Sequence, residues 1–149
     1  MADLVTVTPL KLNVDDRGTL VELLRADEPD AKLGQVYAVT SFSKGTIRGL
    51  HSHDELWDYF VVLLGSAKFR FFNEAGEEQI VVVSSQKLCR LNCPPKIAHG
   101  WMALEDNTIL ISIASEPYMG YGRAGKLDEH RMPYNKFDGD SDGWAVLPR

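Results

Sequence analysis

The chain has 149 residues, 44% hydrophobic and 25% charged, the balance of a soluble globular protein of one domain. Its 16 basic and 21 acidic side chains give a formal net charge of −5, which argues against broad binding to nucleic-acid backbone. No apolar run approaches the roughly 20 residues of a membrane-spanning helix, and the first residues lack the pattern of a signal peptide. We therefore expect one domain over residues 1–149 in the cytoplasm, with a small-molecule or protein partner and no nucleic-acid or membrane partner.

Short apolar runs separated by turn residues predominate along the chain, and long stretches of helical period are scarce. In chain order the runs predict strands over 19–24, 34–42, 57–64, 67–72, 80–83, 88–91 and 108–112, with a hairpin connection over 73–77. The run 57–64 is nearly continuous in apolar residues, as in a strand buried on both faces.

The remaining segments carry weaker signals. Only 26–33 and 126–131 are expected to hold a helical turn or two. The stretch from about residue 118 to the C-terminus is rich in Gly, Asp, Pro and Tyr and is expected to wrap over the strands as irregular structure. Many short strands with few helical turns predict an all-β sandwich or small barrel.

Three histidines form the most informative pattern in the sequence. His51 and His53 are separated by one residue, so the period of a strand points both to the same side. Asp58 follows five residues later, and His99 lies after a Pro-Pro pair in AHGW. With Gly45 and Gly65, these spacings resemble the two sequence motifs of the cupin family and imply a jelly-roll fold.

Two kinds of chemistry can use this cluster, and a structural role is a third possibility. His51, His53, His99 and the Asp58 carboxylate are a plausible ligand set for Zn, Fe, Mn or Ni. Without a metal, the same imidazoles can move protons, because a pKa near 6.5 leaves both forms accessible at neutral pH. Alternatively, the groups are polar side chains satisfied by their neighbours. We favour metal-free acid–base or binding chemistry, and so expect no cofactor.

Longer segments carry a more specific resemblance. The segments are DDRGTLVE at 15–22, GQVYAVTSFSKGTIRGLHSH at 34–53, PPKIAHGWMALED at 94–106 and DEHRMPYN at 128–135. Together they resemble the nucleotide-sugar 3,5-epimerases typified by dTDP-4-dehydrorhamnose 3,5-epimerase. The resemblance implies a jelly-roll cupin, a homodimer that exchanges N-terminal strands, and a nucleoside-diphosphate-linked 4-keto-6-deoxy sugar as substrate in deoxysugar or polysaccharide biosynthesis.

The same resemblance implies roles for individual residues. His51, in RGLH, would be the base that removes a proton next to the ketone. His99, in AHGW, would line the pocket and help to polarise the ketone oxygen. Arg48 and Arg17 would hold the diphosphate, since a guanidinium forks onto paired oxygens. Gln35 would contact the nucleotide or the sugar. For Arg17 and Gln35, capping of a loop or strand is an equally weighted alternative.

The sequence also departs from the family pattern at chemically important positions. The family's active-site tyrosine, its presumed acid, falls on Ser112. The family's carboxylate that orients the base follows the final tryptophan motif, and no counterpart follows Trp144 here. His53 stands where a Gln is usual, and Tyr118 matches a second tyrosine that packs on the sugar.

Replacements for the acid and the orienting group can therefore be proposed. Tyr118 or His53 would serve as the acid, and Asp58 or Asp54 as the orienting carboxylate. His130, in a polar segment, is expected to be a solvated surface residue.

Two other functions stay open. The HSH sequence at 51–53 with Tyr37 upstream resembles the sugar 3,4-ketoisomerases, which move a ketone along the sugar instead of inverting a carbon. The fold could also bind a nucleotide sugar without turnover, or hold a metal and perform unrelated chemistry.

Overall fold

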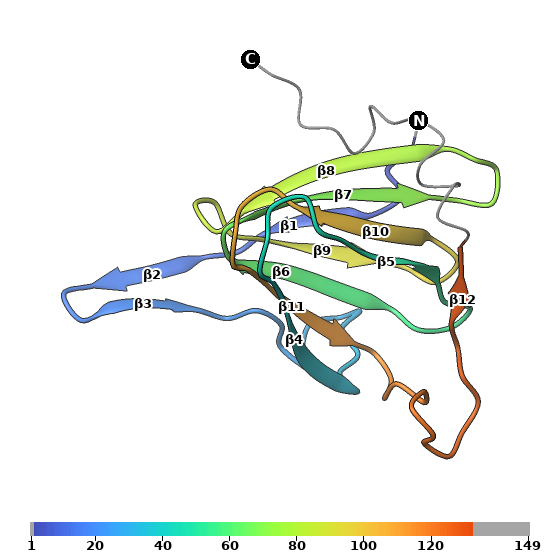
Figure 1. Ribbon diagram of the computed structural model, residues 1–149. Coiled ribbons are helices and arrows are strands. Elements are labelled where there is room, and N and C mark those ends of the chain that lie inside the picture. The colour runs from blue at the N-terminus through green and yellow to red at the C-terminus, as the bar shows by residue number, and fades with distance from the viewer. Residues whose placement is uncertain (1, 133–149) are drawn as a thin grey trace.

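Twelve β-strands make up the part of the chain described by the computed structural model, residues 2–132 (Figure 1). The first sheet contains, in spatial order, β1 (Thr6–Pro9), β9 (Cys89–Cys93), β6 (Asp58–Leu64), β11 (Thr108–Ala114) and β4 (Gln35–Ser41). The second sheet contains β12 (His130–Arg131), β5 (Ile47–Ser52), β10 (Ala98–Ala103), β7 (Ser66–Phe72) and β8 (Glu78–Ser84). The hairpin of β2 (Leu12–Asp15) and β3 (Gly18–Val21) projects away from both sheets (Figure 1).

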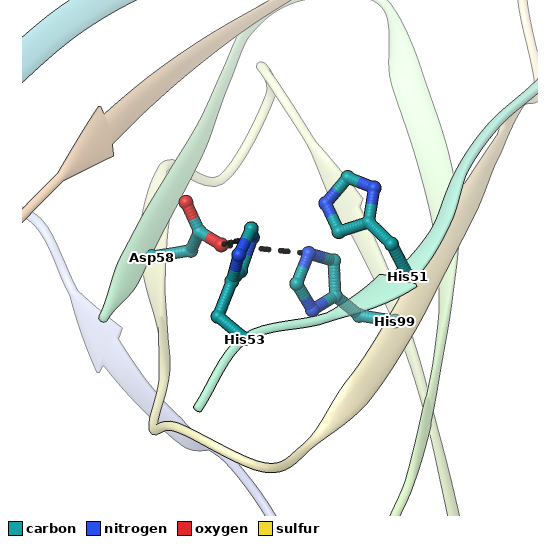
Figure 2. Close-up of side chains that lie close together, drawn as sticks. All are labelled: His51, His53, Asp58 and His99. Atoms are coloured by element: carbon teal, nitrogen blue, oxygen red, sulfur yellow. Dashed lines mark ion pairs between the residues drawn. The ribbon is translucent and has the colours of Figure 1, made fainter. Parts of the chain in front are cut away.

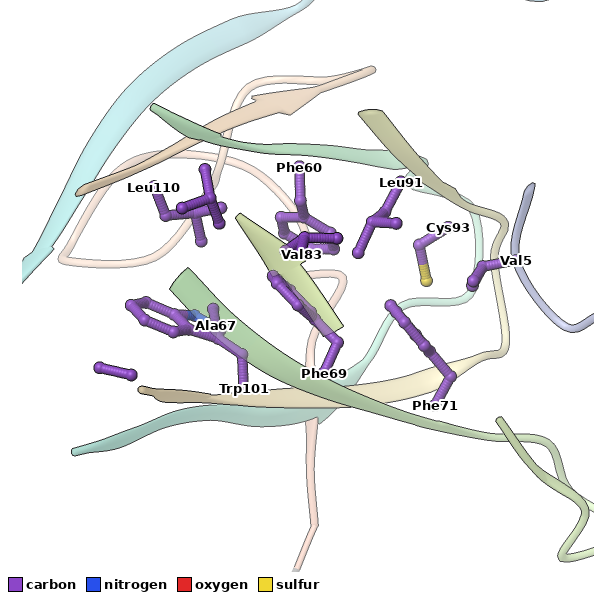
Figure 3. Close-up of a cluster of buried hydrophobic side chains, with 12 residues drawn as sticks. Val5, Phe60, Ala67, Phe69, Phe71, Val83, Leu91, Cys93, Trp101 and Leu110 are labelled. Atoms are coloured by element: carbon purple, nitrogen blue, oxygen red, sulfur yellow. The ribbon is translucent and has the colours of Figure 1, made fainter. Parts of the chain in front are cut away.

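The hydrophobic core lies between the two sheets. Phe69 and Phe71 on β7 point to the same side because they are two residues apart, and both are fully buried. They face Leu91 and Leu110 from the first sheet, which are also buried (Figure 3). Burial of each such side chain contributes about 1.5–3 kcal/mol, so this layer holds the sheets together. The expected all-β cupin sandwich is confirmed.

The expected helical turns are not found. Among residues 2–132 the structure contains no helix, and accordingly none that could span a membrane. The segment 26–33 contains isolated turns closed by hydrogen bonds from Glu28 N to the Arg25 carbonyl and from Ala31 N to the Glu28 carbonyl. The segment 126–131 ends in β12, because its last residues pair with the edge of β5.

Five strands have no counterpart among the predicted strand ranges: β1, β2, β5, β10 and β12. All six residues of β10 are buried, so this strand shows no alternation of polar and apolar residues that a sequence pattern could detect. Strands β1 and β2 have four residues each and are mostly exposed, and β12 has only two. Except for β2, which pairs with β3, these strands form because they pair with residues distant in the sequence, and no local sequence pattern predicts them.

A bulge in β5 determines which side chains reach the interior. His51 pairs with His99 and Gly49 pairs with Gly100, so Leu50 is an extra residue on β5. Gly49 has a φ of 89°, and a Cβ there would lie 3.1 Å from the Gly100 Cα. The bulge therefore needs glycine, and it places residues 48 and 51, three positions apart, on the same face of the sheet.

Candidate active site

Three imidazoles and one carboxylate meet between the sheets (Figure 2). His51 is the last inward-pointing residue of β5, and His53 follows that strand. His99 lies on β10, and Asp58 is the first residue of β6 in the opposite sheet. The His51 ring centroid lies 4.7 Å from that of His99 and 4.8 Å from that of His53. The expected convergence of the histidines is therefore what the structure shows.

His51 is enclosed on one side and accessible on the other. Its Nδ1 atom is buried and makes no well-aligned hydrogen bond to any described residue, although Glu129 Oε1 lies 3.3 Å away. The side chain as a whole is 19% exposed, so Nε2 is the nitrogen left for proton transfer. Burial, with the neighbouring imidazoles of His99 and His53, lowers the pKa of His51 to about 2. The ring is neutral at physiological pH, as a base must be.

His53 lies between two hydrogen-bond acceptors. Its Nδ1 faces the carbonyl oxygen of Asp128, and its Nε2 lies 3.2 Å from Asp58 Oδ2. Burial alone would lower the pKa of His53, but the hydrogen bond and negative charge of Asp58 outweigh it and raise that pKa. Because neither acceptor can donate a proton, the imidazolium form is the one that satisfies both.

His99 is fixed in a different state. Its Nδ1 donates to the carbonyl of Ile97 at 3.1 Å, and its Nε2 lies 3.5 Å from Asp58 Oδ2. Complete burial lowers the pKa of His99, and Asp58 opposes this only in part. The side chain is 4% exposed and packs on Phe60. His99 therefore forms the inner wall of the site behind His51.

These pKa shifts predict a loss of stability in mild acid. An unfolded histidine titrates near pH 6.5, so unfolding takes up a proton at His51 at any pH between about 2 and 6.5. The free energy of unfolding should fall by about 2 kcal/mol from pH 6.5 to pH 5 through His51 alone. His53 does not offset this loss. Folding raises the pKa of His53, so its contribution to the free energy of unfolding is fully present below pH 6.5 and is lost only at higher pH.

Urea denaturation at the two pH values measures this loss. The variant His51→Asn should show a clearly smaller difference between them. The same pH dependence in both proteins would show that His51 carries a proton in the folded state.

Tyr37 supplies a phenol at the position where the sequence suggested that one had been lost. In the pairing of β4 with β11, Tyr37 lies directly opposite Ser112. Cross-strand partners share a face, so the small buried Ser112 leaves room for the tyrosine ring. The residue is 40% exposed, yet burial of its hydroxyl end and the charge of Asp58 raise the pKa of Tyr37 to about 12. The phenol therefore keeps its proton.

Tyr118 and Gln35 lie at the rim of the site. The Gln35 side-chain oxygen accepts a hydrogen bond from Tyr118 N at 2.6 Å, which holds the chain where it leaves the sheet. The Tyr118 hydroxyl lies 3.5 Å from Glu129 Oε2. A cavity of about 300 Å³ opens beside this contact, between Tyr118 and Asp128. Gln35 positions backbone in this chain, and no contact with His51 is found for it.

The two arginines expected to bind diphosphate have different placements. Arg48 is exposed and pairs with Trp101, which faces the interior, so it lies on the same face as His51. Arg17 is at the tip of the projecting hairpin, 85% exposed and paired with Asp15. The structure brings Arg48 to the site and leaves Arg17 outside it.

Asp54 is not placed to orient His51. It forms an exposed ion pair with His130 at 2.8 Å. His130 is a surface residue, as expected. Asp58 is not the partner of His51 either, because it binds His53 and His99.

The carboxylate beside His51 is Glu129, which sequence reasoning missed. The segment 128–132 runs along β5: Asp128 accepts backbone hydrogen bonds from residues 54, 55 and 56, and Met132 N donates to the Leu50 carbonyl. Glu129, 7% exposed, is thereby held against His51. The segment DEHR at 128–131 was a signal of the family resemblance, but only the strand pairing shows which acidic residue points inward.

The cluster also has the composition of a metal site. His51, His53, Asp58 and His99 each offer a ligand atom, and these atoms all lie within 4.8 Å of one another. Zinc and iron accept imidazole and carboxylate together. Elemental analysis of the purified protein decides between this use of the cluster and the acid–base use.

Two facing antiparallel sheets, with His51 on β5, His53 directly after it and His99 on the neighbouring β10, define a cupin jelly roll. The family model described as "Polysaccharide biosynthesis C-terminal domain" matches residues 13–120, and the chain belongs to that family.

Individual relatives agree with the resemblance to nucleotide-sugar epimerases and isomerases. The chain is 28% identical over 144 residues to the spore coat polysaccharide biosynthesis protein SpsL of Bacillus subtilis, covering 91% of both chains. It is 27% identical to the probable low-salt glycan biosynthesis epimerase Agl13 of Haloferax volcanii, covering 88% of this chain and 87% of that protein.

The fold is shared with solved structures of sugar isomerases. The sugar 3,4-ketoisomerase QdtA of Thermoanaerobacterium thermosaccharolyticum, solved with TDP, superposes with a TM-score of 0.75 at 24% identity. The match covers 95% of this chain and 98% of QdtA.

Proposed function

We propose that this protein is a nucleotide-diphosphate-sugar epimerase, which inverts C3, C5 or both of a 4-keto-6-deoxy sugar in deoxysugar or polysaccharide biosynthesis. The observation that carries the proposal is the neutral His51 ring, with the Glu129 carboxylate at Nδ1 and the phenol of Tyr37 near the same cluster. The resemblance to epimerases, and the name of the Haloferax relative, support it.

The base step follows from the geometry of His51. When Nδ1 carries the proton and faces Glu129, Nε2 has a lone pair directed away from the carboxylate. Nε2 removes a proton from the carbon next to the ketone, and the electrons of that C–H bond form a C=C bond while the ketone oxygen becomes an enolate. Glu129 stabilises the imidazolium that results.

The enolate then needs a donor. Tyr37 keeps its proton at neutral pH and lies on the opposite sheet from His51. A phenol there can deliver a proton to the face of the carbon opposite the base, which inverts it and restores the ketone. The tyrosinate then regains a proton and His51 releases its own to solvent. His53 and Asp58 supply a fixed charge pair beside this reaction.

A ketoisomerase is the second candidate, favoured by one observation. Tyr37 lies next to a cluster that contains the HSH pair, the combination that resembles the 3,4-ketoisomerases. If His51 returned the proton to C4 on the same face, and the proton of the C3 hydroxyl passed to the oxygen on C4, the ketone would move to C3 without inversion.

We also propose an oligomeric state, a location and diphosphate contacts for the protein. The exposed hairpin that carries Arg17 suits a homodimer, in which it would reach the partner subunit and Arg17 would contact the partner's substrate. The composition suits a cytoplasmic enzyme of one domain, in which sugar nucleotides are the partners. Arg48, on the face of His51, would hold the diphosphate.

Product analysis tests the proposed reaction. Purified protein should be incubated with dTDP-, GDP- and CDP-linked 4-keto-6-deoxy sugars and the products identified by NMR. We expect inversion at C3, C5 or both for one nucleotide series. A ketone moved to C3 would establish the ketoisomerase instead, and unchanged sugars throughout would reject both reactions.

A further inference from the structure

Within residues 2–132, Glu129 has three polar neighbours and no short contact with any of them. Its carboxylate lies 3.3 Å from His51 Nδ1, 3.4 Å from an Arg131 guanidinium nitrogen and 3.5 Å from the Tyr118 hydroxyl. The side chain is 7% exposed, so water does not satisfy it. A buried carboxylate normally holds shorter, charge-assisted hydrogen bonds of about 2.7–2.9 Å. In this arrangement Glu129 is shared between the base and Arg131.

Arg131 is placed to meet a ligand at the same site. In the pairing of β12 with β5, Arg131 lies directly opposite His51, so the two side chains leave the sheet on the same face. Its side chain is 69% exposed, and an ion pair with so exposed a partner is weak. A doubly charged diphosphate can therefore compete with Glu129 for the guanidinium.

The bulge of β5 places a second guanidinium on this face. Arg48 and Arg131 both neighbour His51, one along its own strand and one across to β12. Two arginines beside the base form a positively charged surface that suits a diphosphate. Each guanidinium can donate paired N–H hydrogen bonds to the phosphate oxygens.

We propose that Arg131 is a second arm of the diphosphate subsite, and that its transfer from Glu129 to the diphosphate leaves Glu129 to orient His51. This inference rests on the proposed function for its substrate. Binding of the diphosphate then orients the ring of His51. Glu129, released from Arg131, accepts a hydrogen bond from the Nδ1–H of His51, and the Nε2 lone pair points toward the sugar. Glu129 acts through His51 and is a positioning residue.

Binding of a simple probe tests the subsite. Isothermal titration with inorganic pyrophosphate and with dTDP should show affinity reduced about tenfold or more in Arg131→Gln, with a smaller loss in Arg131→Lys. Arg25→Gln is the matched control, because Arg25 is another exposed arginine paired with carboxylates, outside the site. Equal affinities in Arg131→Gln and Arg25→Gln would overturn the proposal.

The ring of His51 reports the coupling. Nitrogen NMR with labelled histidine should show dTDP shifting His51 toward the Nδ1–H form in the native chain. In Arg131→Gln that form should predominate even without dTDP. Glu129→Gln should bind pyrophosphate at least as tightly as the native chain but show no such shift. A His51 signal that does not respond to dTDP in the native chain would refute the coupling.

The two proposals can fail separately. If Arg131→Gln weakens pyrophosphate binding and His51 responds to dTDP, but no 4-keto sugar is converted, the subsite and its coupling stand and the epimerase proposal falls. If sugars are converted and Arg131→Gln binds pyrophosphate normally, the epimerase proposal stands and the proposed role of Arg131 falls.

Discussion

Replacement of His51 by Asn should reduce the exchange of deuterium into the carbon next to the ketone by about 10³-fold. Asparagine keeps a polar group close to Glu129 but has no nitrogen that can accept a proton near neutral pH. The loss should appear in kcat more than in KM, because the substitution leaves Arg48 and Arg131, the proposed diphosphate contacts, unchanged. Proton NMR of the sugar in deuterated buffer measures the exchange.

A matched control separates this effect from general damage. His130→Asn removes another imidazole from the same sheet, but one that is exposed and paired with Asp54. It should retain the native exchange rate. Full exchange in His51→Asn would remove His51 from the role of base.

Replacement of Asp58 by Asn should lower the free energy of unfolding by about 3 kcal/mol at pH 6, where His53 is protonated. The imidazolium of His53 is 7% exposed and would lose its anionic partner. The loss should be smaller at higher pH, where His53 can give up its proton instead. Urea denaturation at both pH values gives the difference.

The control is Asp54→Asn, which breaks the exposed pair with His130 and should cost at most about 1 kcal/mol. Adding His53→Gln to Asp58→Asn should recover part of the loss, because the uncompensated charge is then removed. If Asp58→Asn behaves like Asp54→Asn, His53 is neutral and the charge pair does not exist.

Much of the fold could be predicted because its strands carry local signals. The alternation of Phe69 and Phe71 with charged residues, and the apolar run that became β6, depend only on neighbouring positions. By contrast, β10 is buried on both faces and β12 is two residues long, so both are defined by their pairing with β5. Between residue 118 and β12 the structure contains no strand or helix, and the rest of the segment expected to be irregular lies outside the described residues. Trp144 lies outside the described residues.

The candidate site was predicted in part for a similar reason. Fixed spacing along the chain pointed to His51, His53, Asp58 and His99, which the structure brings together. Register between strands brings other residues beside these side chains, and those neighbours control the protonation of the histidines. The resemblance to the ketoisomerases pointed to Tyr37, but its position opposite Ser112 across β4 and β11 is a matter of register that a sequence pattern does not reveal.

Glu129 could not be identified from the sequence because its position also depends on strand pairing. Glu129, Asp54 and Asp58 are all acidic residues near the histidines in the fold, and composition cannot rank them. The two-residue pairing of β12 with β5 sets Glu129 against His51 and leaves Asp54 at the surface with His130. Local register therefore distinguishes the orienting group from a surface ion pair.

The most direct test is to convert a nucleotide-linked 4-keto-6-deoxy sugar with the native protein in deuterium oxide and locate the label by NMR. We predict deuterium at C3 or C5 of a product with inverted configuration at the labelled carbon. An inverted product that retains its original hydrogen, or a bound sugar that acquires no deuterium, would contradict proton removal to solvent-exchangeable His51.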